Sequence, residues 1–415
     1  MDHVFIKRVK AKNFKSIAAC DVSLGSLTYL VGPNGSGKSN VIDVMHFVKD
    51  ALQGSLENAL QMRGGLTEVR RRSGGHPTHF GIRLDFRLPD GRNGFYAFNI
   101  GAKPAGGFEV QQEELALGEV GAGPRYHVGQ GKVVASSENV FPVSTADRLA
   151  LVNAAGLPAF RPVFDALTQM NFYNLNPRVI RDLQKPQEGS TLKPLGENVA
   201  SAIAFLERHA PADKKIIEEY LSLVVPSVHG VERIGVGHME TIEFRQDTAG
   251  SRHPWRFLAN SMSDGTLRAL GILVALFQGG QSSGPSLVGI EEPEVALHPA
   301  AAAVVRDALA RASERSQILV TSHSPEILDD FSISADSLLA VDRQEGLTEI
   351  GPLDEASRTA LRERLFTAGE LLKLNQLTPD PASRIAPGPR RQSISASGRS
   401  GSAIGGGRPG CGARQ

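Results

Sequence analysis

Apolar residues along this chain form short continuous runs, and segments with helical spacing follow them. The runs 27–31, 286–290 and 317–320 are rich in Leu, Ile and Val, as buried strands of a parallel sheet are. Apolar residues recur at helical spacing over 41–48, and an alanine-rich segment follows Pro299. This alternation of strands and helices predicts an α/β fold with a parallel core sheet.

A second pattern occupies residues 50–145. Residues 81–88 alternate apolar and charged side chains, a Pro-Asp-Gly turn follows at 89–91, and an apolar and aromatic run follows at 95–100. This order predicts a β-hairpin. Further short strands, separated by glycine-rich turns, are expected at 108–110, 126–128 and 132–135. We therefore predict an antiparallel β layer beside the parallel core.

Residues 145–228 are predicted to be mainly helical. Val199, Ile203 and Leu206 share one face of an amphipathic helix, and residues 214–225 form a second helix. No heptad pattern is sustained, so long coiled-coil arms are not expected. The predicted layout is one head over 1–376, with a core at 1–50 and 260–350, a β-rich insertion at 50–145, a helical subdomain at 145–228, and a disordered tail rich in Pro, Gly, Ser and Arg at 377–415.

Composition and charge narrow the protein class. The 415 residues are 41% hydrophobic and carry a net charge of +1, so no global field indicates nucleic acid or a membrane surface. Cys20 and Cys411 are the only cysteines, which excludes a disulfide framework and a C-x-x-C metal site. No apolar run reaches the roughly 18 residues of a membrane-spanning helix, and the charged N-terminus is unlike a signal peptide. A cytoplasmic protein without a membrane partner is expected.

The stretch that follows the strand at 27–31 has the sequence of a phosphate-binding loop. It matches the full pattern G-x-x-x-x-G-K-[ST] in a strand-to-helix context, with Gly32, Pro33, Asn34, Gly35, Ser36, Gly37, Lys38 and Ser39. The glycines let backbone N–H groups turn toward phosphate oxygens, and the helix N-terminus favours negative charge. Lys38 is expected to reach the β- and γ-phosphates of ATP, and Ser39 to bind Mg²⁺. The segments 1–50 and 260–350 are therefore predicted to form a nucleotide core.

The strand at 286–290 runs into acidic residues, which is a Walker B pattern. In open α/β sheets the ligand meets the carboxyl ends of the strands, so Glu291 and Glu292 are expected at the phosphates. Glu291 is expected to hold Mg²⁺ through water. Glu292 is expected to be the general base that activates the attacking water.

Residues 9–17, the phosphate-binding loop and Asn40 together resemble the beginning of SMC-like and RecF-like ATPases of the ABC superfamily. The segments 170–181 and 195–201 are similar to bacterial predicted ATPases of the same branch, and the resemblance covers residues 4–375. It implies an α/β ABC-ATPase head, in which helices flank the P-loop core sheet and an antiparallel β layer and a helical subdomain are added. It also implies that Asn40 belongs to the ATP-binding segment.

Two further motifs take their roles from this resemblance. The helix start at 263–266 resembles the ABC signature, whose serine and glycine contact the γ-phosphate bound to the other subunit. Its residues are Ser263, Asp264, Gly265 and Thr266. The segment 321–325 resembles the switch-histidine segment, which implies that His323 hydrogen-bonds the γ-phosphate near Glu292. The resemblance therefore implies a homodimer that closes head to tail around ATP.

The process that ATP hydrolysis drives stays open between three alternatives. One is a switch in DNA repair or phage defence that acts on a separate effector protein. Another is the energising subunit of an ABC transporter, against which Asn40, the acidic run 291–294 and the β-rich insertion argue. The third is a nuclease of the overcoming-lysogenisation-defect type, which needs a C-terminal Toprim domain. The 92 residues after His323 leave no room for that domain, so any nuclease is expected on another chain.

Three features of the sequence have more than one interpretation. The run 70–72 contains three arginines that either contact DNA phosphates or form a solvated loop. The arginines of the tail either bind polyanions weakly or only solubilise the chain. The Q-loop glutamine of ABC ATPases is not assigned among Gln61, Gln111 and Gln112.

Overall fold

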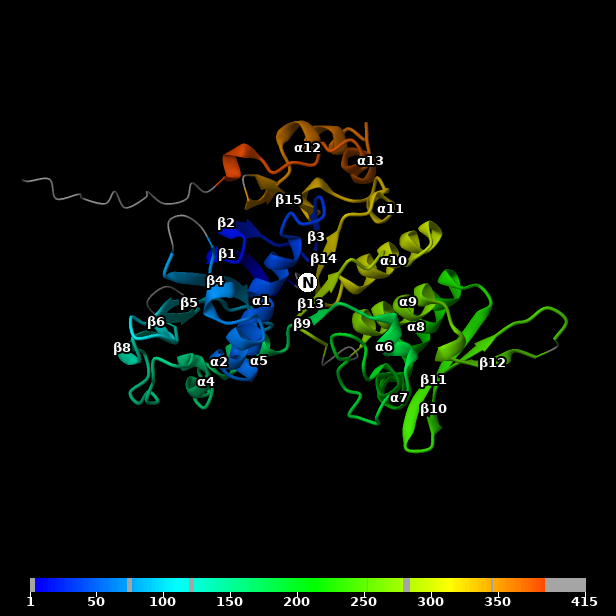
Figure 1. The fold of residues 1–415 in the computed structure, drawn as a ribbon, viewed down its shortest axis with the longest axis horizontal. Coiled ribbons are helices and arrows are strands. Elements are labelled where there is room, and N and C mark those ends of the chain that lie inside the picture. Colours follow the sequence, from blue (N-terminus) through cyan, green and yellow to red (C-terminus); the bar gives the residue numbers. More distant parts are fainter. Residues whose placement is uncertain are drawn as a thin grey trace, which may run out of the picture.

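The computed structural model describes residues 4–72, 77–118, 123–251, 253–278, 284–344 and 346–384. Three parts are visible in Figure 1: a first lobe (blue to cyan), a second lobe (green) and a C-terminal cap (orange). Strands β3, β14 and β13 lie between the two lobes. No helix in the described part of the chain is long and apolar enough to cross a membrane.

Thirteen strands of the described residues form one sheet, in the order β8-β7-β6-β5-β4-β1-β2-β16-β15-β3-β14-β13-β9. Strands β15, β3, β14, β13 and β9 are parallel, whereas β1, β2 and β4–β8 pair antiparallel. The predicted α/β fold is confirmed, and its antiparallel layer continues the core sheet. The bounds are β1 Ile6–Phe14, β2 Ile17–Ser23, β3 Leu27–Val31, β4 His79–Arg87, β5 Asn93–Ala102, β6 Phe108–Leu117, β7 Arg125–Gly129, β8 Lys132–Ser136, β9 Asn171–Tyr173, β13 Leu287–Glu291, β14 Gln317–Ser322, β15 Leu338–Gln344 and β16 Leu347–Pro352.

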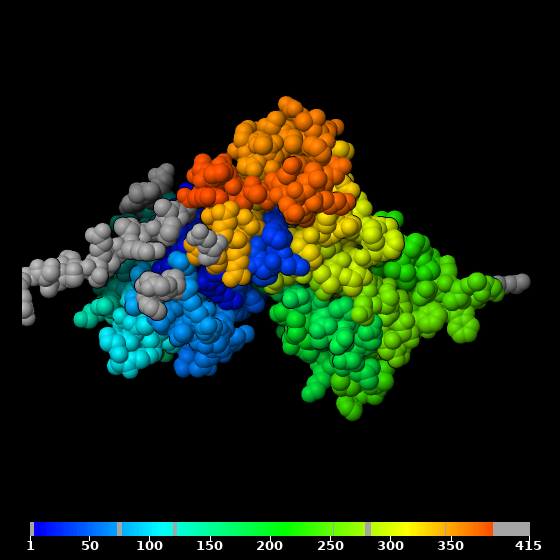
Figure 2. Space-filling model, turned by 45° about the horizontal axis from the view of Figure 1, so that its top comes forward, coloured from blue at the N-terminus to red at the C-terminus, as the bar shows by residue number. Residues whose placement is uncertain are grey.

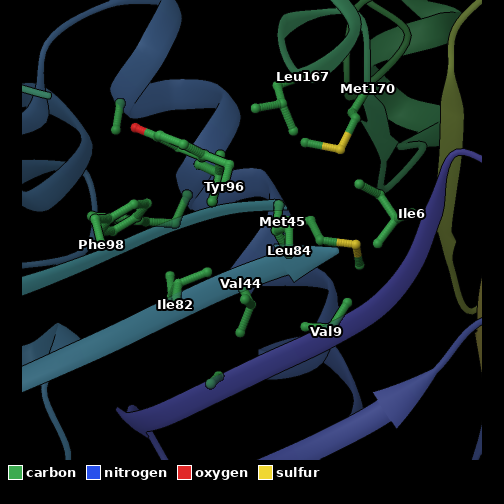
Figure 3. Packing of buried hydrophobic residues seen from close by; sticks show 14 of the residues in the cluster. Ile6, Val9, Val44, Met45, Ile82, Leu84, Tyr96, Phe98, Leu167 and Met170 are labelled. Carbon is green, nitrogen blue, oxygen red and sulfur yellow. The ribbon is translucent and has the colours of Figure 1, made fainter. Parts of the chain in front are cut away.

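Helix α1 (Lys38–Gln53) packs its apolar face on the first lobe's sheet. Val44 and Met45 of this helix lie near Val9 of β1 and Leu84 of β4, as Figure 3 shows, and all four are fully buried. Burying each such side chain stabilises the fold by about 1.5–3 kcal/mol. This packing fixes the helix whose first turn closes the phosphate-binding loop.

Four short helices complete the first lobe around α1. They are α2 (Leu56–Gln61), α3 (Leu66–Val69), α4 (Ala150–Ala154) and α5 (Arg161–Thr168). The buried carboxylate of Glu113 on β6 anchors α4, because it accepts hydrogen bonds from Ala150 N at 2.5 Å and Leu151 N at 2.8 Å. The first part of the predicted helical subdomain thus packs on the core and not in the second lobe.

The second lobe is built around α9, which is buried along nearly its whole length. Helices α6, α7 and α8 pack on α9, and a separate three-stranded sheet in the order β10-β11-β12 adjoins α7 and α8. Helix α10 packs on both α8 and α9. The bounds are α6 Pro177–Arg181, α7 Val199–His209, α8 Pro211–Val224, β10 Val228–Val236, β11 Met239–Gln246, β12 Trp255–Leu258, η1 Ala259–Ser261, α9 Asp264–Phe277 and α10 Pro299–Ala312.

The C-terminal cap differs from the sequence prediction at its end. Its elements are α11 Pro325–Leu328, η2 Ala335–Ser337, α12 Glu355–Arg362, α13 Ala368–Lys373 and η3 Pro381–Ser383. Residues 377–384, predicted to begin the disordered tail, pack on β16. Asp380 N donates to Pro352 O at 2.8 Å, and Arg384 pairs with Glu349 at 3.0 Å. The tail prediction is wrong for these residues because backbone and ionic contacts hold them, and the rest of the tail lies outside the described residues.

Candidate functional site

The candidate site lies where three neighbouring parallel strands end. The order β3-β14-β13 places the loop at 32–39, the segment after Ser322 and the end of β13 side by side. Glu291 pairs in register with Thr321, and Ser322 with Val31. Motifs separated by some 290 residues of sequence therefore meet at one edge of the sheet, which is the ligand-binding edge of open α/β sheets.

The phosphate-binding loop has a conformation that its glycines permit. Gly37 has φ 107°, and a Cβ there would lie 2.2 Å from Thr348 Oγ1. Lys38 is buried, and its Nζ donates to Gly32 O at 2.8 Å and Pro33 O at 2.9 Å. Burial lowers the pKa of Lys38. Its only hydrogen-bond partners among the described residues are neutral carbonyls, so an anion would be a stronger partner.

Two loop residues fit a bound triphosphate in different ways. Ser36 Oγ is buried without a hydrogen-bond partner among the described residues, so its hydroxyl is free to donate to a phosphate oxygen. Gly35 has open space around its Cα, which allows a ligand to approach the backbone closely. Pro33 and Asn34 are exposed at the mouth of the loop.

A small polar network supports the loop from behind. Asn40 Nδ2 donates to Ser16 Oγ at 2.6 Å, and Ser16 Oγ lies 2.6 Å from Thr348 Oγ1. Thr348 Oγ1 donates in turn to Ser36 O at 2.8 Å. Sequence reasoning assigned Asn40 to ATP binding, whereas in the structure its amide contacts this network. It gave no role to Ser16, although Ser16 lies in the segment 9–17 used for the resemblance, and it missed Thr348, which is more than 300 residues away in sequence and belongs to no motif.

Glu291 and Ser39 form the part of the site that suits a divalent cation. Ser39 hydrogen-bonds the Glu291 carboxylate, while burial raises the pKa of that carboxyl. Oxygen ligands of this kind, completed by phosphates and water, are what Mg²⁺ prefers. No group of three or more His, Cys, Asp or Glu side chains in the described ranges could hold a metal. A cation here would thus depend on the phosphates of ATP.

Glu292, Glu294 and His323 form a carboxylate–imidazole cluster. His323 Nδ1 lies 3.3 Å from Glu292 Oε1 and 3.7 Å from Glu294 Oε1. Glu294 Oε1 also accepts from Ser322 Oγ at 2.7 Å and from His323 N at 3.1 Å. Glu294 is buried, and its second oxygen has no hydrogen-bond partner among the described residues. Sequence reasoning gave Glu294 no chemical role, although the structure makes it the residue that positions the histidine.

Arg268 is a second residue that sequence reasoning missed. It lies on α9 and is buried, and its guanidinium donates to the carbonyls of Leu175 at 2.5 Å, Glu292 at 2.8 Å and Glu291 at 3.2 Å. Burial lowers the pKa of Arg268, and the charges of Glu294 and Glu292 oppose that shift. One side chain thus joins the second lobe to the backbone of Glu291, the candidate metal ligand, and of Glu292, the candidate general base.

The segment 263–266 begins α9 in the second lobe, whereas the phosphate-binding loop leads into α1 in the first lobe. Ser263 caps the helix by accepting from Thr266 N at 3.2 Å, and Asp264 pairs with Arg181 at 2.5 Å. Ser263 and Asp264 are exposed, so both can be reached from outside the chain. At Gly265 an added Cβ would lie 2.6 Å from Ala296 O, so only glycine allows this contact with the segment after β13.

None of the three glutamines considered for the Q-loop contacts the phosphate-binding loop or the end of β13 among the described residues. Gln111 and Gln112 are on β6, and six strands (β5, β4, β1, β2, β16 and β15) separate β6 from β3. Seven spacings of about 4.8 Å place β6 roughly 34 Å from β3. Gln61 is on α2 and donates to Glu57. The residue that does lie at this edge of the sheet is Asn174. It follows the end of β9 at Tyr173, which pairs in register with Ile290, the residue before Glu291.

The run of arginines at 70–72 lies against the end of β1. Arg70 forms a bridge with Phe14, and Arg71 N donates to Asn13 O at 2.8 Å. Arg72 pairs with Glu68, which compensates part of the charge. These contacts favour neither of the two interpretations of the run.

The fold and this site define a P-loop ATPase of the SMC-like and RecF-like branch, as the motifs predicted. The chain belongs to the family described as "AAA domain, putative AbiEii toxin, Type IV TA system" (AAA_21), whose model matches residues 27–329.

Two proteins with similar sequences are consistent with this class of ATPase. OLD nuclease of Thermus scotoductus is 24% identical over 382 residues, which cover 86% of this chain and 66% of that protein. The chain thus spans just under two thirds of that relative's length. Chromosome partition protein Smc of Mycoplasma pneumoniae is 50% identical over 48 residues, which cover 11% of this chain and 5% of that protein.

Solved structures show the same fold at low identity. A SmcHead bound to the C-winged helix domain of ScpA has a TM-score of 0.53 and 17% identity, covering 85% of this chain and 99% of its own. An Smc head with an extended coiled coil, bound to the C-terminal domain of ScpA and derived from Pyrococcus furiosus, has a TM-score of 0.51 and 14% identity, covering 87% of this chain and 99% of its own. At these identities the likeness concerns the fold alone.

Proposed function

We propose that this chain binds ATP with Mg²⁺ and hydrolyses it to ADP and phosphate. The observation that carries the proposal is the convergence, at the ends of β3, β14 and β13, of the loop at 32–39, of Glu291 and Glu292, and of His323. Glu291 ends β13 and Glu292 follows it, and Glu291 contacts Ser39 of the phosphate-binding loop, which suits phosphoryl transfer to water. This arrangement supports ATP hydrolysis over cleavage of nucleic acid as the reaction of this site.

Each residue has a distinct task in the proposed reaction. Lys38 and the backbone N–H groups of the loop hold the phosphates, and Glu292 accepts a proton from the attacking water. Mg²⁺, held by Ser39 and Glu291, would supply charge neutralisation at the β- and γ-phosphates. His323 would donate to the γ-phosphate, and Glu294 would keep the His323 backbone in place through the hydrogen bond from His323 N. Catalysis is then positioning and charge stabilisation around the phosphoryl group.

We further propose that two copies complete each other's sites. The helix start at 263–266 would meet the γ-phosphate bound to the other subunit, so each ATP would lie between Lys38 of one chain and Ser263 of its partner. The exposure of Ser263 and Asp264 supports this arrangement. The helix N-terminus there also favours an anion. ATP would therefore act as a switch for dimerisation, and hydrolysis would separate the heads.

A mixing experiment tests the composite site. Lys38→Ala and Ser263→Arg should each abolish ATP hydrolysis, because each homodimer then contains two defective sites. A one-to-one mixture should regain ATP hydrolysis, because each mixed dimer pairs the intact Lys38 of one chain with the intact Ser263 of the other. The matched control mixes Ser263→Arg with the double variant, which should recover nothing. No recovery in the first mixture, with both variants folded and Ser263→Arg still able to bind ATP, would contradict the composite site.

We propose that the switch acts on DNA or on a separate protein. The names of its relatives, a nuclease and a chromosome partition protein, and the ScpA-bound heads among its structural neighbours support this reading. Duplex DNA should raise the ATPase rate and should bind with a salt dependence that reports phosphate contacts. Absence of both effects would leave a protein effector as the partner to seek.

A further inference from the structure

A polar hollow of about 610 Å³ lies between the two lobes and is lined by residues of both. No residue of the phosphate-binding loop lines it. One wall is formed by α1, β9 and the end of α5, including His46, Lys49 and Asn171. The other wall is formed by residues 187–194 and Asn198. Figure 2 shows the notch between the blue and green segments. We call this space the interlobe hollow.

The interlobe hollow and the ATP site lie at different ends of α1. Lys49 follows Lys38 by eleven residues on the same helix, which at 1.5 Å per residue places it about 16 Å away. A volume of this size lies within the range of small-molecule sites, roughly 300–1,000 Å³.

Positive charge in the interlobe hollow is poorly compensated. Lys49 Nζ donates to Asn171 Oδ1 at 2.8 Å, which is a neutral acceptor, and has no carboxylate within ion-pair distance among the described residues. Burial lowers the pKa of Lys49. Lys193 on the opposite wall likewise has no ion pair in the described ranges. Glu188 is the one carboxylate among the described lining residues, and its Oε1 accepts from Ser190 Oγ at 3.0 Å.

The wall at 187–194 is held in shape without a ligand. Asn198 is almost completely buried (1% exposed); its Oδ1 accepts from Lys193 N at 2.8 Å and its Nδ2 donates to Thr191 O at 2.9 Å. Gln278 Oε1 accepts from Leu192 N at 2.6 Å. A preformed wall lowers the ordering cost of binding.

We propose that the interlobe hollow binds a small anionic molecule, whose phosphate or carboxylate group lies between Lys49 and Lys193, and that this ligand regulates ATP turnover. An anion there would replace the neutral partner of a partly buried ammonium group and would join α1 to the opposite wall. Lysine is a common ligand for such groups. The binding half of the proposal is independent of the proposed ATPase function, and the regulatory half rests on it.

A continuous set of contacts connects the interlobe hollow with the ATP site. Pro194 O accepts from Asn174 N at 3.0 Å, in the segment where the chain passes from β9 to the second lobe. The next residue, Leu175, accepts through its carbonyl from Arg268, which also donates to the carbonyls of Glu291 and Glu292. A ligand that fixes residues 187–194 would therefore restrain the backbone that positions both glutamates. The ATPase rate measures this coupling directly.

Binding is tested in a chain that carries Lys38→Ala, so that the ATP site does not dominate. Isothermal titration at constant ionic strength with ribose 5-phosphate and with succinate distinguishes a phosphate from a carboxylate ligand. We expect one of the two to bind, and Lys49→Ala in the same background to weaken it by about tenfold or more. Lys185→Ala is the matched control, because Lys185 is exposed on the adjoining segment and does not line the interlobe hollow. Thermal unfolding without anion verifies that both variants fold.

The regulatory half is tested with the ATPase rate of the otherwise wild-type chain. The anion that binds should change the rate by about fivefold or more, and Lys49→Ala should keep its basal rate but lose the response. Binding of neither anion, or equal loss in Lys49→Ala and Lys185→Ala, would overturn the proposed site. Binding without any change in rate would overturn only the regulation. A wild-type chain without ATPase activity would refute the proposed function and leave the titration result valid.

Discussion

Replacing Arg268 by methionine tests whether the second lobe positions Glu292, the proposed general base, and Glu291, the proposed metal ligand. The variant keeps an unbranched apolar stem but removes the guanidinium, which donates to Leu175 O at 2.5 Å, to Glu292 O at 2.8 Å and to Glu291 O at 3.2 Å. Arg268 is 6% exposed, so water cannot fully replace these donors.

The magnitude follows from the two shorter bonds. A hydrogen bond to a charged group contributes about 1.5–3 kcal/mol, so two such bonds contribute about 3–6 kcal/mol. Removing a buried charge also removes its desolvation cost, which offsets part of this loss. We expect the free energy of unfolding to fall by about 2–4 kcal/mol. Because Glu292 loses a backbone contact, we expect kcat to fall by about 100-fold while KM for ATP changes far less.

Urea unfolding and steady-state ATPase kinetics measure both effects. Arg268→Lys should lie between wild type and Arg268→Met, since an ammonium group lacks the planar fork that reaches three carbonyls. Arg362→Met serves as the control, because Arg362 is exposed at the end of α12. The reasoning is refuted if Arg268→Met unfolds and turns over ATP like the wild type.

Three further changes test separate parts of the site and fold. Gly37→Ala places a Cβ 2.2 Å from Thr348 Oγ1, on a residue whose φ is 107°. ATP affinity, measured with a fluorescent analogue, should therefore fall by about tenfold or more. Unchanged affinity would contradict the loop conformation. Glu294→Gln removes the charge that holds His323, so turnover should fall by about tenfold with ATP binding retained; equal rates would remove Glu294 from the mechanism. Burial raises the pKa of Glu113, so its ionisation opposes folding. Relative to Glu113→Gln, the wild type should lose stability in urea as pH rises above the ordinary pKa of a glutamate, and a constant difference would be inconsistent with the shift.

The sequence predicts those parts of the site that are local in the chain. The loop at 32–39 and the strand that ends at Glu291 each carry their chemistry within about ten residues, and their strand context follows from apolar runs. The α/β fold and the hairpin at 81–100 follow from periodicity in the same way.

Residues that act across the fold were not predictable from local patterns. Thr348 and Arg268 are ordinary in their sequence setting, and Ser16 lies in a recognised segment that indicates no partner for it. The importance of all three comes from partners 23 to more than 300 residues away. The end of the head was missed for a similar reason, since Arg384 is held by Glu349 in a segment whose composition indicates disorder. Periodicity detects which face is buried but not which distant residue it meets.

The central claim is that ATP joins two copies of this chain, and the molar mass of Glu292→Gln measured by light scattering with size-exclusion chromatography tests it most directly. Without the general base, the variant should retain ATP and remain in the closed state. With Mg²⁺ and ATP we predict twice the mass of one chain, and without ATP the mass of one chain. A variant that binds ATP but keeps the mass of one chain, while the wild type hydrolyses ATP, would contradict the account.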